Sequence, residues 1–106
     1  MNNTLQRLEA MIAARQHAVP ESSYVAQLNA KGLDTILKKM GEEAIETVIA
    51  AKSGSREATI YETADLLFHT LVMLGHQHIA LAEILAELDR REGTSGIDEK
   101  NSRIAT

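Results

Sequence analysis

The sequence predicts an all-α protein, a bundle of about four to five helices. Its apolar content is mainly Ala, Leu and Ile, which are compatible with helices. Apolar side chains recur at spacings of three and four residues, and no useful stretch shows the alternation typical of strands. Glycines and serines separate these segments where helices are expected to begin and end.

The first two predicted helices are short. Residues 4–17 carry apolar side chains at helical spacing, and Pro20 closes this unit. A second helix follows, which Ser22 or Ser23 caps and Gly32 ends. The apolar positions that support these two helices are Leu5, Leu8, Ile12, Tyr24, Val25 and Leu28.

The third and fourth predicted helices are longer. Asp34 is expected to cap the third, which runs to about Lys52. Ser55 caps the fourth, which runs to about Gly75 or His76. On the third helix one apolar stripe is expected to lie opposite the acidic residues. Its members are Leu37, Met40, Ala44, Val48 and Ala51.

Residues 80–92 are expected to form the fifth helix. Its inward-facing residues are predicted to be Leu81, Ile84, Leu85 and Leu88. From Gly93 the sequence becomes polar and rich in Gly and Ser. We therefore expect one domain over residues 1–92 and a polar tail over residues 93–106, which is either flexible or closes over a site.

Composition excludes several functions. The net charge of −4 argues against nucleic-acid binding, which requires a basic surface. The absence of cysteine excludes disulfides, thiol nucleophiles and thiolate zinc sites. No apolar run approaches the ~18 residues of a membrane span, and no signal-peptide pattern opens the chain. We expect a cytoplasmic protein that does not interact with membranes.

Two pairs of carboxylates carry the expected chemistry. Glu43 and Glu46 are three residues apart on the third helix, and Glu62 and Asp65 are three apart on the fourth. Residues at this spacing project from nearly one face of a helix. If the two helices pack together, four carboxylates converge, and such oxygen ligands suit Mg²⁺, with Mn²⁺ as an alternative.

The fourth helix provides the stronger argument for a metal. It is apolar nearly all round, so it is expected to be buried. Burial of Glu62 and Asp65 without a partner is costly, and a cation removes that cost. Its wide apolar surface also suggests that a second copy of the chain is needed to cover it, which predicts a homodimer.

Simpler interpretations remain open at this stage. The acids of the third helix can be an ordinary solvated face, and the protein a non-catalytic dimerisation or adaptor module. Lys38 and Lys39 can form surface ion pairs with acids four residues on, or contact phosphates. His69 is expected to be a hydrogen-bonded core histidine or a support for the site rather than a ligand.

Two segments carry a resemblance to a known family. Residues 38–46 are KKMGEEAIE, and residues 62–69 are ETADLLFH. They resemble the phosphoribosyl-ATP pyrophosphatases, a branch of the MazG-like all-α nucleotide pyrophosphohydrolases with the signature Glu-x-x-Glu followed by Glu-x-x-Asp. The likeness spans about residues 4–104 and includes SYVAQL at residues 23–28. His78 stands where we expect a turn glycine.

The resemblance implies an activity and a set of site residues. The activity is hydrolysis of phosphoribosyl-ATP to phosphoribosyl-AMP and pyrophosphate, the second step of histidine biosynthesis, by a Mg²⁺-dependent dimer. A broader nucleoside triphosphate pyrophosphohydrolase, acting on dUTP or other nucleotides, is the alternative. The implied metal ligands are Glu43, Glu46, Glu62 and Asp65.

The remaining expected roles concern water and pyrophosphate. One acid of the third helix is expected to orient the attacking water, and the candidates are Glu42, Glu43 and Glu46. Glu42 can also act as an additional or outer acid of the metal site. Three basic residues are candidates for contacts with the leaving pyrophosphate, namely Lys39, Lys100 and Arg103.

Overall fold

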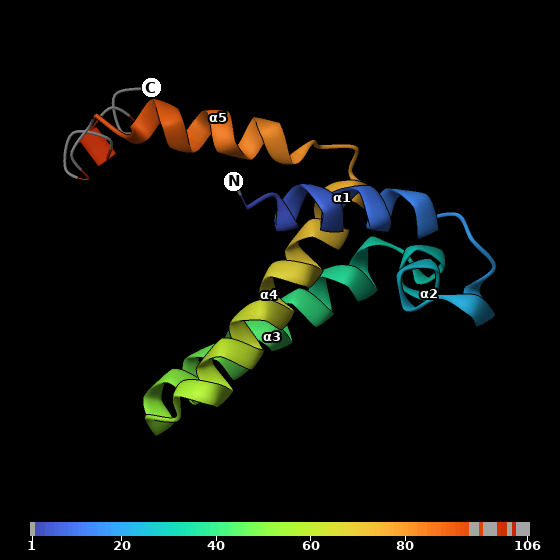
Figure 1. Ribbon diagram of the computed structural model, residues 1–106, viewed down its shortest axis with the longest axis horizontal. Helices are drawn as coiled ribbons and strands as arrows, with labels where there is room; N and C mark the ends of the chain where they lie inside the picture. The colour runs from blue at the N-terminus through green and yellow to red at the C-terminus, as the bar shows by residue number, and fades with distance from the viewer. Residues whose placement is uncertain (1, 94–95, 97–99, 102, 104–106) are drawn as a thin grey trace.

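The computed structural model describes residues 2–93, 96, 100, 101 and 103 (Figure 1). It confirms the all-α prediction, because residues 2–93 contain five α-helices and one short 3-10 helix, and no described residue lies in a strand. The elements are α1 (Thr4–Arg15), η1 (Pro20–Ser22), α2 (Tyr24–Lys31), α3 (Leu33–Ser53), α4 (Arg56–His76) and α5 (Leu81–Arg91). Most of the predicted tail lies outside the described residues.

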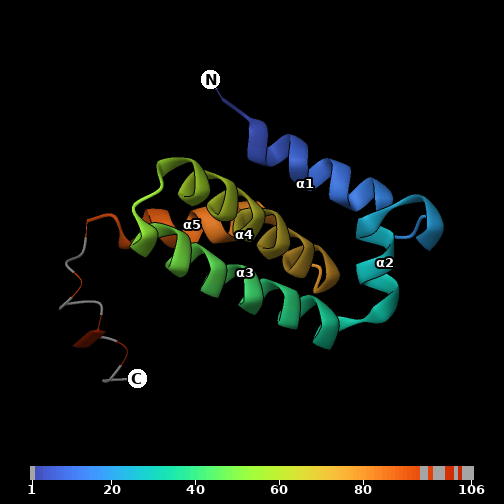
Figure 2. The ribbon, with the colours of Figure 1, turned by 90° about the horizontal axis from the view of Figure 1, so that it is seen from below.

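Helices α3 and α4 form an antiparallel hairpin that dominates the structure. They lie side by side in both views (Figures 1 and 2). Gly54 ends α3 with a φ of 83°, a left-handed conformation that favours glycine. The predicted cap of α4 is confirmed, because the Ala58 N–H donates to Ser55 Oγ at 3.1 Å.

Helices α1 and α2 pack against the C-terminal half of α4 and the start of α3 (Figure 2). A hydrogen bond of 2.7 Å between His76 Nδ1 and Asn29 Oδ1 joins α4 to α2. The core therefore lies at one end of the hairpin. Its buried residues are Ile12, Val25, Leu28, Ile36, Leu71, Val72, Leu74 and Leu81.

The structure corrects one of the predicted helix caps. Ser23, one of the two candidates, caps α2 by accepting from the Ala26 N–H at 3.3 Å. Asp34 does not cap α3, because the helix begins at Leu33 directly after Gly32. Gly32, whose φ is 99°, is the single residue that connects α2 to α3. Asp34 instead lies in the first turn, where the helix dipole favours a negative charge.

The apolar stripe predicted on α3, opposite its acidic residues, is not the buried face of the helix. The buried residues of α3 are Ile36, Glu43 and Ala50, which are seven residues apart and form one line along the helix. Val48, a member of the predicted stripe, is 68% exposed. The carboxylate of Glu43 thus occupies the face that packs on α4, while much of the apolar stripe faces outward.

Helix α5 departs from its predicted packing as well. Only Leu81 is buried, and Leu88 is 55% exposed. Figure 1 shows α5 turning back from the end of α4 and extending at a distance from the α3–α4 hairpin. Its first turn is held by Glu9, whose Oε2 accepts from the Leu81 N–H at 2.7 Å. The other predicted inward residues, Ile84 and Leu85, are also exposed, each at 38%.

A large apolar surface therefore remains uncovered on the two hairpin helices. On α3 and α4 it comprises Leu37, Ile45, Val48, Ile49, Ile60, Tyr61 and Leu67. Exposed apolar side chains that gather into a large patch commonly mark a contact site in proteins. Among the described helices, none is by itself long and apolar enough to cross a membrane, and α4 and α5 meet that criterion only together, across a bend of 112°.

His78 in the α4–α5 connection provides a test of the backbone. Its φ is 59°, a left-handed conformation that costs a non-glycine residue about 1 kcal/mol, and the sequence led us to expect glycine there. His78→Gly should raise the free energy of unfolding by about 1 kcal/mol in urea denaturation at a fixed protein concentration. Gln77→Gly, at an ordinary φ of −92°, is the matched control and should lower it. Equal destabilisation by both changes would contradict the strained backbone.

Candidate active site

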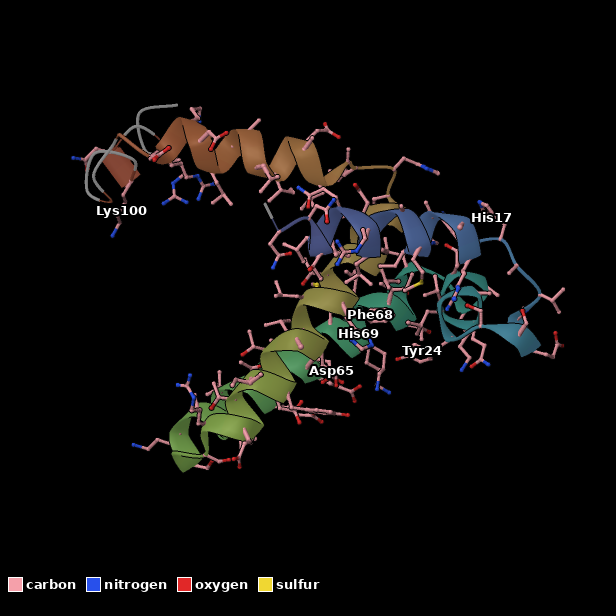
Figure 3. All side chains as sticks on the ribbon, viewed as in Figure 1. His17, Tyr24, Asp65, Phe68, His69 and Lys100 are labelled. Atoms are coloured by element: carbon pink, nitrogen blue, oxygen red, sulfur yellow. The ribbon has the colours of Figure 1, made fainter. Side chains whose placement is uncertain are left out.

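Three carboxylates from the two long helices meet at one point. Glu43 comes from α3, and Glu62 and Asp65 come from α4. One oxygen of each lies within 4.8 Å of the others. Glu43 is only 6% exposed, and Glu62 and Asp65 are half-buried. Figure 3 places Asp65 near the middle of the hairpin, next to His69 and Tyr24. We call these three residues the acidic centre.

Two oxygens of the acidic centre lack partners. Glu43 Oε2 and Glu62 Oε2 are both buried, and neither has a hydrogen-bond partner. Buried polar atoms are normally hydrogen-bonded, and unpaired buried carboxylates are especially costly. Three converging carboxylates with unpartnered oxygens fit a hard divalent cation, which takes oxygen ligands. The residues present therefore suit Mg²⁺ or Mn²⁺.

The raised pKa values of Glu43 and Glu62 are consistent with a cation site. Burial, together with the neighbouring acids Glu46 and Asp65, raises the pKa of Glu43 to about 7. Burial is also the largest cause that raises the pKa of Glu62, and the neighbouring Glu46 carboxyl adds to it. The acids thus oppose one another's ionisation, as expected when like charges are held together with no cation between them.

Glu46 and Glu42 lie at the edge of the acidic centre. Glu46 is exposed and does not belong to the group of three, although its carboxyl raises the pKa of Glu43 and of Glu62. With Glu62 it lines a cavity of about 300 Å³ between α3 and α4. Glu42 is 48% exposed, and its Oε1 lies 3.7 Å from Lys39 Nζ.

Of the three predicted basic residues, the structure places one, Lys39, next to the acidic centre. Lys39 Nζ lies 4.0 Å from Glu43 Oε1, so its ammonium borders the acidic centre. Lys100 is exposed and lies beyond α5, away from Asp65 (Figure 3). Arg103 is also exposed. Lys38 is exposed. Within residues 2–93, Lys39 rather than Lys38 forms the ion pairs with the neighbouring acids Glu42 and Glu43.

His69 fulfils the expectation of a hydrogen-bonded core histidine. It is 4% exposed, and its Nδ1 lies 2.8 Å from the Asp65 carbonyl oxygen, which can only accept. Nδ1 therefore carries the proton, and in the neutral ring Nε2 accepts from the Tyr24 hydroxyl at 2.9 Å. Burial raises the pKa of the Tyr24 phenol, Lys39 opposes this rise, and Glu43 adds to it. The Tyr24 phenol is therefore close enough to the acidic centre to feel its charges.

Sequence reasoning missed two residues of the site. Tyr24 was predicted only as a helix residue, yet its ring stacks on Phe68 at 6.2 Å and meets His69 edge-on at 5.7 Å. Thr47 was not singled out, although its hydroxyl donates to the Glu43 carbonyl oxygen at 2.8 Å. Its position, one turn after Glu43, was the available signal, but spacing does not reveal which hydroxyls reach a second helix.

The fold and the acidic centre define an all-α protein in which a helical hairpin holds a half-buried group of carboxylates. Comparison with known proteins narrows this class. The family model for phosphoribosyl-ATP pyrophosphohydrolase matches residues 5–92. The chain therefore belongs to that family, and it is a hydrolase of a phosphoanhydride bond.

Individual relatives support the same assignment. A phosphoribosyl-ATP pyrophosphatase of Erythrobacter litoralis is 63% identical over 101 residues, which cover 95% of this chain and 97% of the relative. A protein of the same name from Geobacter sulfurreducens is 59% identical over 102 residues, covering 96% of this chain and 94% of the relative. The similarity thus extends over nearly the whole of both chains.

The acidic centre predicts an unusual dependence of stability on pH. Because the pKa of Glu43 is raised above its usual value of 4.5, its ionisation destabilises the metal-free fold as the pH rises through about 7. In EDTA the free energy of unfolding should therefore fall between pH 5 and pH 8. Glu43→Gln should remove much of this fall and stabilise the metal-free protein at pH 8 by about 1–3 kcal/mol.

Chemical denaturation at several pH values measures this effect. Glu57→Gln, at an exposed position in the first turn of α4, is the control and should leave the pH dependence unchanged. Addition of Mg²⁺ should stabilise the wild-type protein more at pH 8 than at pH 5.5, since the cation competes with protons. An unchanged pH dependence in Glu43→Gln would contradict the burial of this charge.

Proposed function

We propose that this protein hydrolyses phosphoribosyl-ATP to phosphoribosyl-AMP and pyrophosphate in a Mg²⁺-dependent reaction, the second step of histidine biosynthesis in the cytoplasm. One observation carries the proposal: the acidic centre, with two buried oxygens that lack partners, lies on the helical hairpin of a phosphoribosyl-ATP pyrophosphohydrolase family member. The names of the relatives supply the substrate.

Glu43, Glu62 and Asp65 would hold the cation, with Glu46 as the fourth acid beside them. When bound, Mg²⁺ neutralises charge on the polyphosphate and polarises the phosphorus that is attacked. This charge neutralisation also explains how a chain with a net charge of −4 can bind an anionic substrate. Membership of an enzyme family disfavours the non-catalytic dimerisation module.

The residues around the acidic centre have complementary tasks. The Lys39 ammonium, 4.0 Å from Glu43 Oε1, is placed to attract phosphate oxygens. Glu42 and Glu46 are the exposed acids at the edge, so a water can reach them while Glu43 is buried. One of these two carboxylates orients the water and accepts its proton as the α–β phosphoanhydride bond breaks. Phosphoryl transfer needs little other help from side chains.

A homodimer completes this proposal. The exposed apolar residues of α3 and α4 lie on the hairpin that carries the acidic centre, for example Val48 at 68% and Ile60 at 58% exposure. A second hairpin packed on them would form a four-helix bundle, which is the usual way in which such faces are buried. The partner in this proposal is a second copy of the same chain.

Substrate specificity tests the function directly. The purified protein, incubated with Mg²⁺ and pyrophosphate detection, should hydrolyse phosphoribosyl-ATP at least a hundredfold more efficiently than ATP or dUTP, compared as kcat/KM. EDTA should abolish the reaction, and added Mg²⁺ should restore it. Comparable turnover of dUTP or ATP would instead identify a broader nucleoside triphosphate pyrophosphohydrolase.

Neutral variants of the acidic centre test the roles of its residues. Glu62→Gln and Asp65→Asn each remove one negative ligand, so each should lower kcat/KM at least a hundredfold while the protein stays folded. Circular dichroism and steady-state kinetics measure the two properties. Glu57→Gln on the same helix should retain full activity.

The same kinetic assay distinguishes the roles of the two exposed acids, Glu42 and Glu46. If Glu42 or Glu46 orients the water, its replacement by Gln lowers kcat without weakening the affinity for Mg²⁺. A replacement that weakens Mg²⁺ binding marks a ligand instead. Full activity in both Glu62→Gln and Asp65→Asn would exclude the acidic centre as the active site.

The dimer has its own test. Val48→Asp places a charge on the exposed apolar face of α3, where it costs little in a lone chain and much in an interface. Sedimentation equilibrium should show a dimer for the wild type and a mostly monomeric Val48→Asp variant. Ala14→Asp, on the exposed side of α1, should remain dimeric. A monomeric wild type would contradict the proposed assembly.

A further inference from the structure

Thr47 links the two helices that carry the acidic centre. Its hydroxyl lies 2.8 Å from the Glu43 carbonyl oxygen, one turn earlier on α3. The same hydroxyl lies 3.1 Å from the Glu62 carbonyl oxygen on α4. A hydroxyl has one proton, so this is a three-centre hydrogen bond with two accepting carbonyls. Both carbonyls belong to residues whose buried carboxylate oxygens lack partners.

The contact with α4 is not a general consequence of threonine in a helix. Thr59 and Thr70 on α4 also donate to the carbonyl oxygen four residues earlier, each at 2.8 Å. Within residues 2–93 neither of these two hydroxyls donates across to another helix. Thr47 therefore makes the common intrahelical bond and, in addition, a specific bond between α3 and α4.

The position of this bond matters because the acids oppose close packing. Carboxylates from α3 and α4 repel each other across the helix contact when no cation lies between them. The buried line of α3 offers little apolar packing there, since Glu43 occupies the position between Ile36 and Ala50. The Thr47 hydroxyl holds the two backbones together at the level of these acids.

We propose that Thr47 is a positioning residue that fixes the spacing of Glu43 and Glu62 and thereby sets the affinity of the acidic centre for a divalent cation. The inference rests on the proposed function, because it assumes that the acidic centre is the cation site. Groups that support metal ligands through hydrogen bonds commonly change metal affinity by 10–100-fold when removed. Thr47 acts through the backbone carbonyls of Glu43 and Glu62 and is not among the carboxylates that would hold the cation.

Titration with Mn²⁺ tests this role without substrate. Free Mn²⁺ is measured by electron paramagnetic resonance in the presence of the intact protein. Thr47→Val keeps the shape of the side chain but removes its donor, and should weaken Mn²⁺ binding about tenfold. Thr47→Ala, which lacks the donor without added bulk, should do the same. Thr47→Ser retains the hydroxyl and should bind Mn²⁺ within about twofold of the wild type.

Thr70→Val is the matched control, because among the described residues its hydroxyl makes the intrahelical bond and no bond to another helix. It should lose stability as Thr47→Val does but keep the wild-type affinity for Mn²⁺. Wild-type affinity in both Thr47→Val and Thr47→Ala would overturn the positioning role and leave the proposed function intact. A wild-type protein that hydrolyses its substrate but binds no Mn²⁺ or Mg²⁺ would overturn the cation site and, with it, the inference.

Discussion

The burial of the Glu43 carboxylate against α4 is the constraint on which the rest of the structure depends. An isolated charge in this position is unfavourable, and two more acids from α4 increase the cost. A protein retains such a group only where another gain offsets the cost, and we propose that a divalent cation provides that gain. On this proposal, the metal-free fold gives up stability in exchange for a cation site.

The unfavourable burial of these acids is confined to the middle of the α3–α4 hairpin. The apolar core lies at the end where α1 and α2 pack, and the tight turn at Gly54 with the Ser55 cap fixes the other end. These two fixed ends limit how far α3 and α4 can separate, and the Thr47 hydroxyl joins the two backbones between them. Tyr24 and the buried His69 connect α2 to the same region, which makes the short second helix part of the site rather than a linker.

Sequence patterns were sufficient for the fold class, and for the pairing of Glu62 with Asp65, because both follow from helical periodicity. The sequence also identified Ser55 as the cap of α4. The predicted cap Asp34 is not a cap, since the single residue Gly32 connects α2 and α3.

Helical periodicity did not predict the inner face of α3. It treats a carboxylate as an outward residue, but Glu43 is buried and Val48 is exposed. The exposed apolar residues of α5, such as Leu88, were predicted inward because an apolar pattern does not reveal whether a neighbouring helix packs on it. Contacts between helices, such as that of Thr47 with Glu62, depend on the register of packing and leave no periodic signal.

The location of a bound cation tests the central claim most directly. Crystals of the protein grown with Mn²⁺ allow the ion to be located by its anomalous scattering. We predict an anomalous peak in direct contact with carboxylate oxygens of Glu43, Glu62 and Asp65. Well-ordered crystals in which these three carboxylates bind no ion at saturating Mn²⁺ would contradict it.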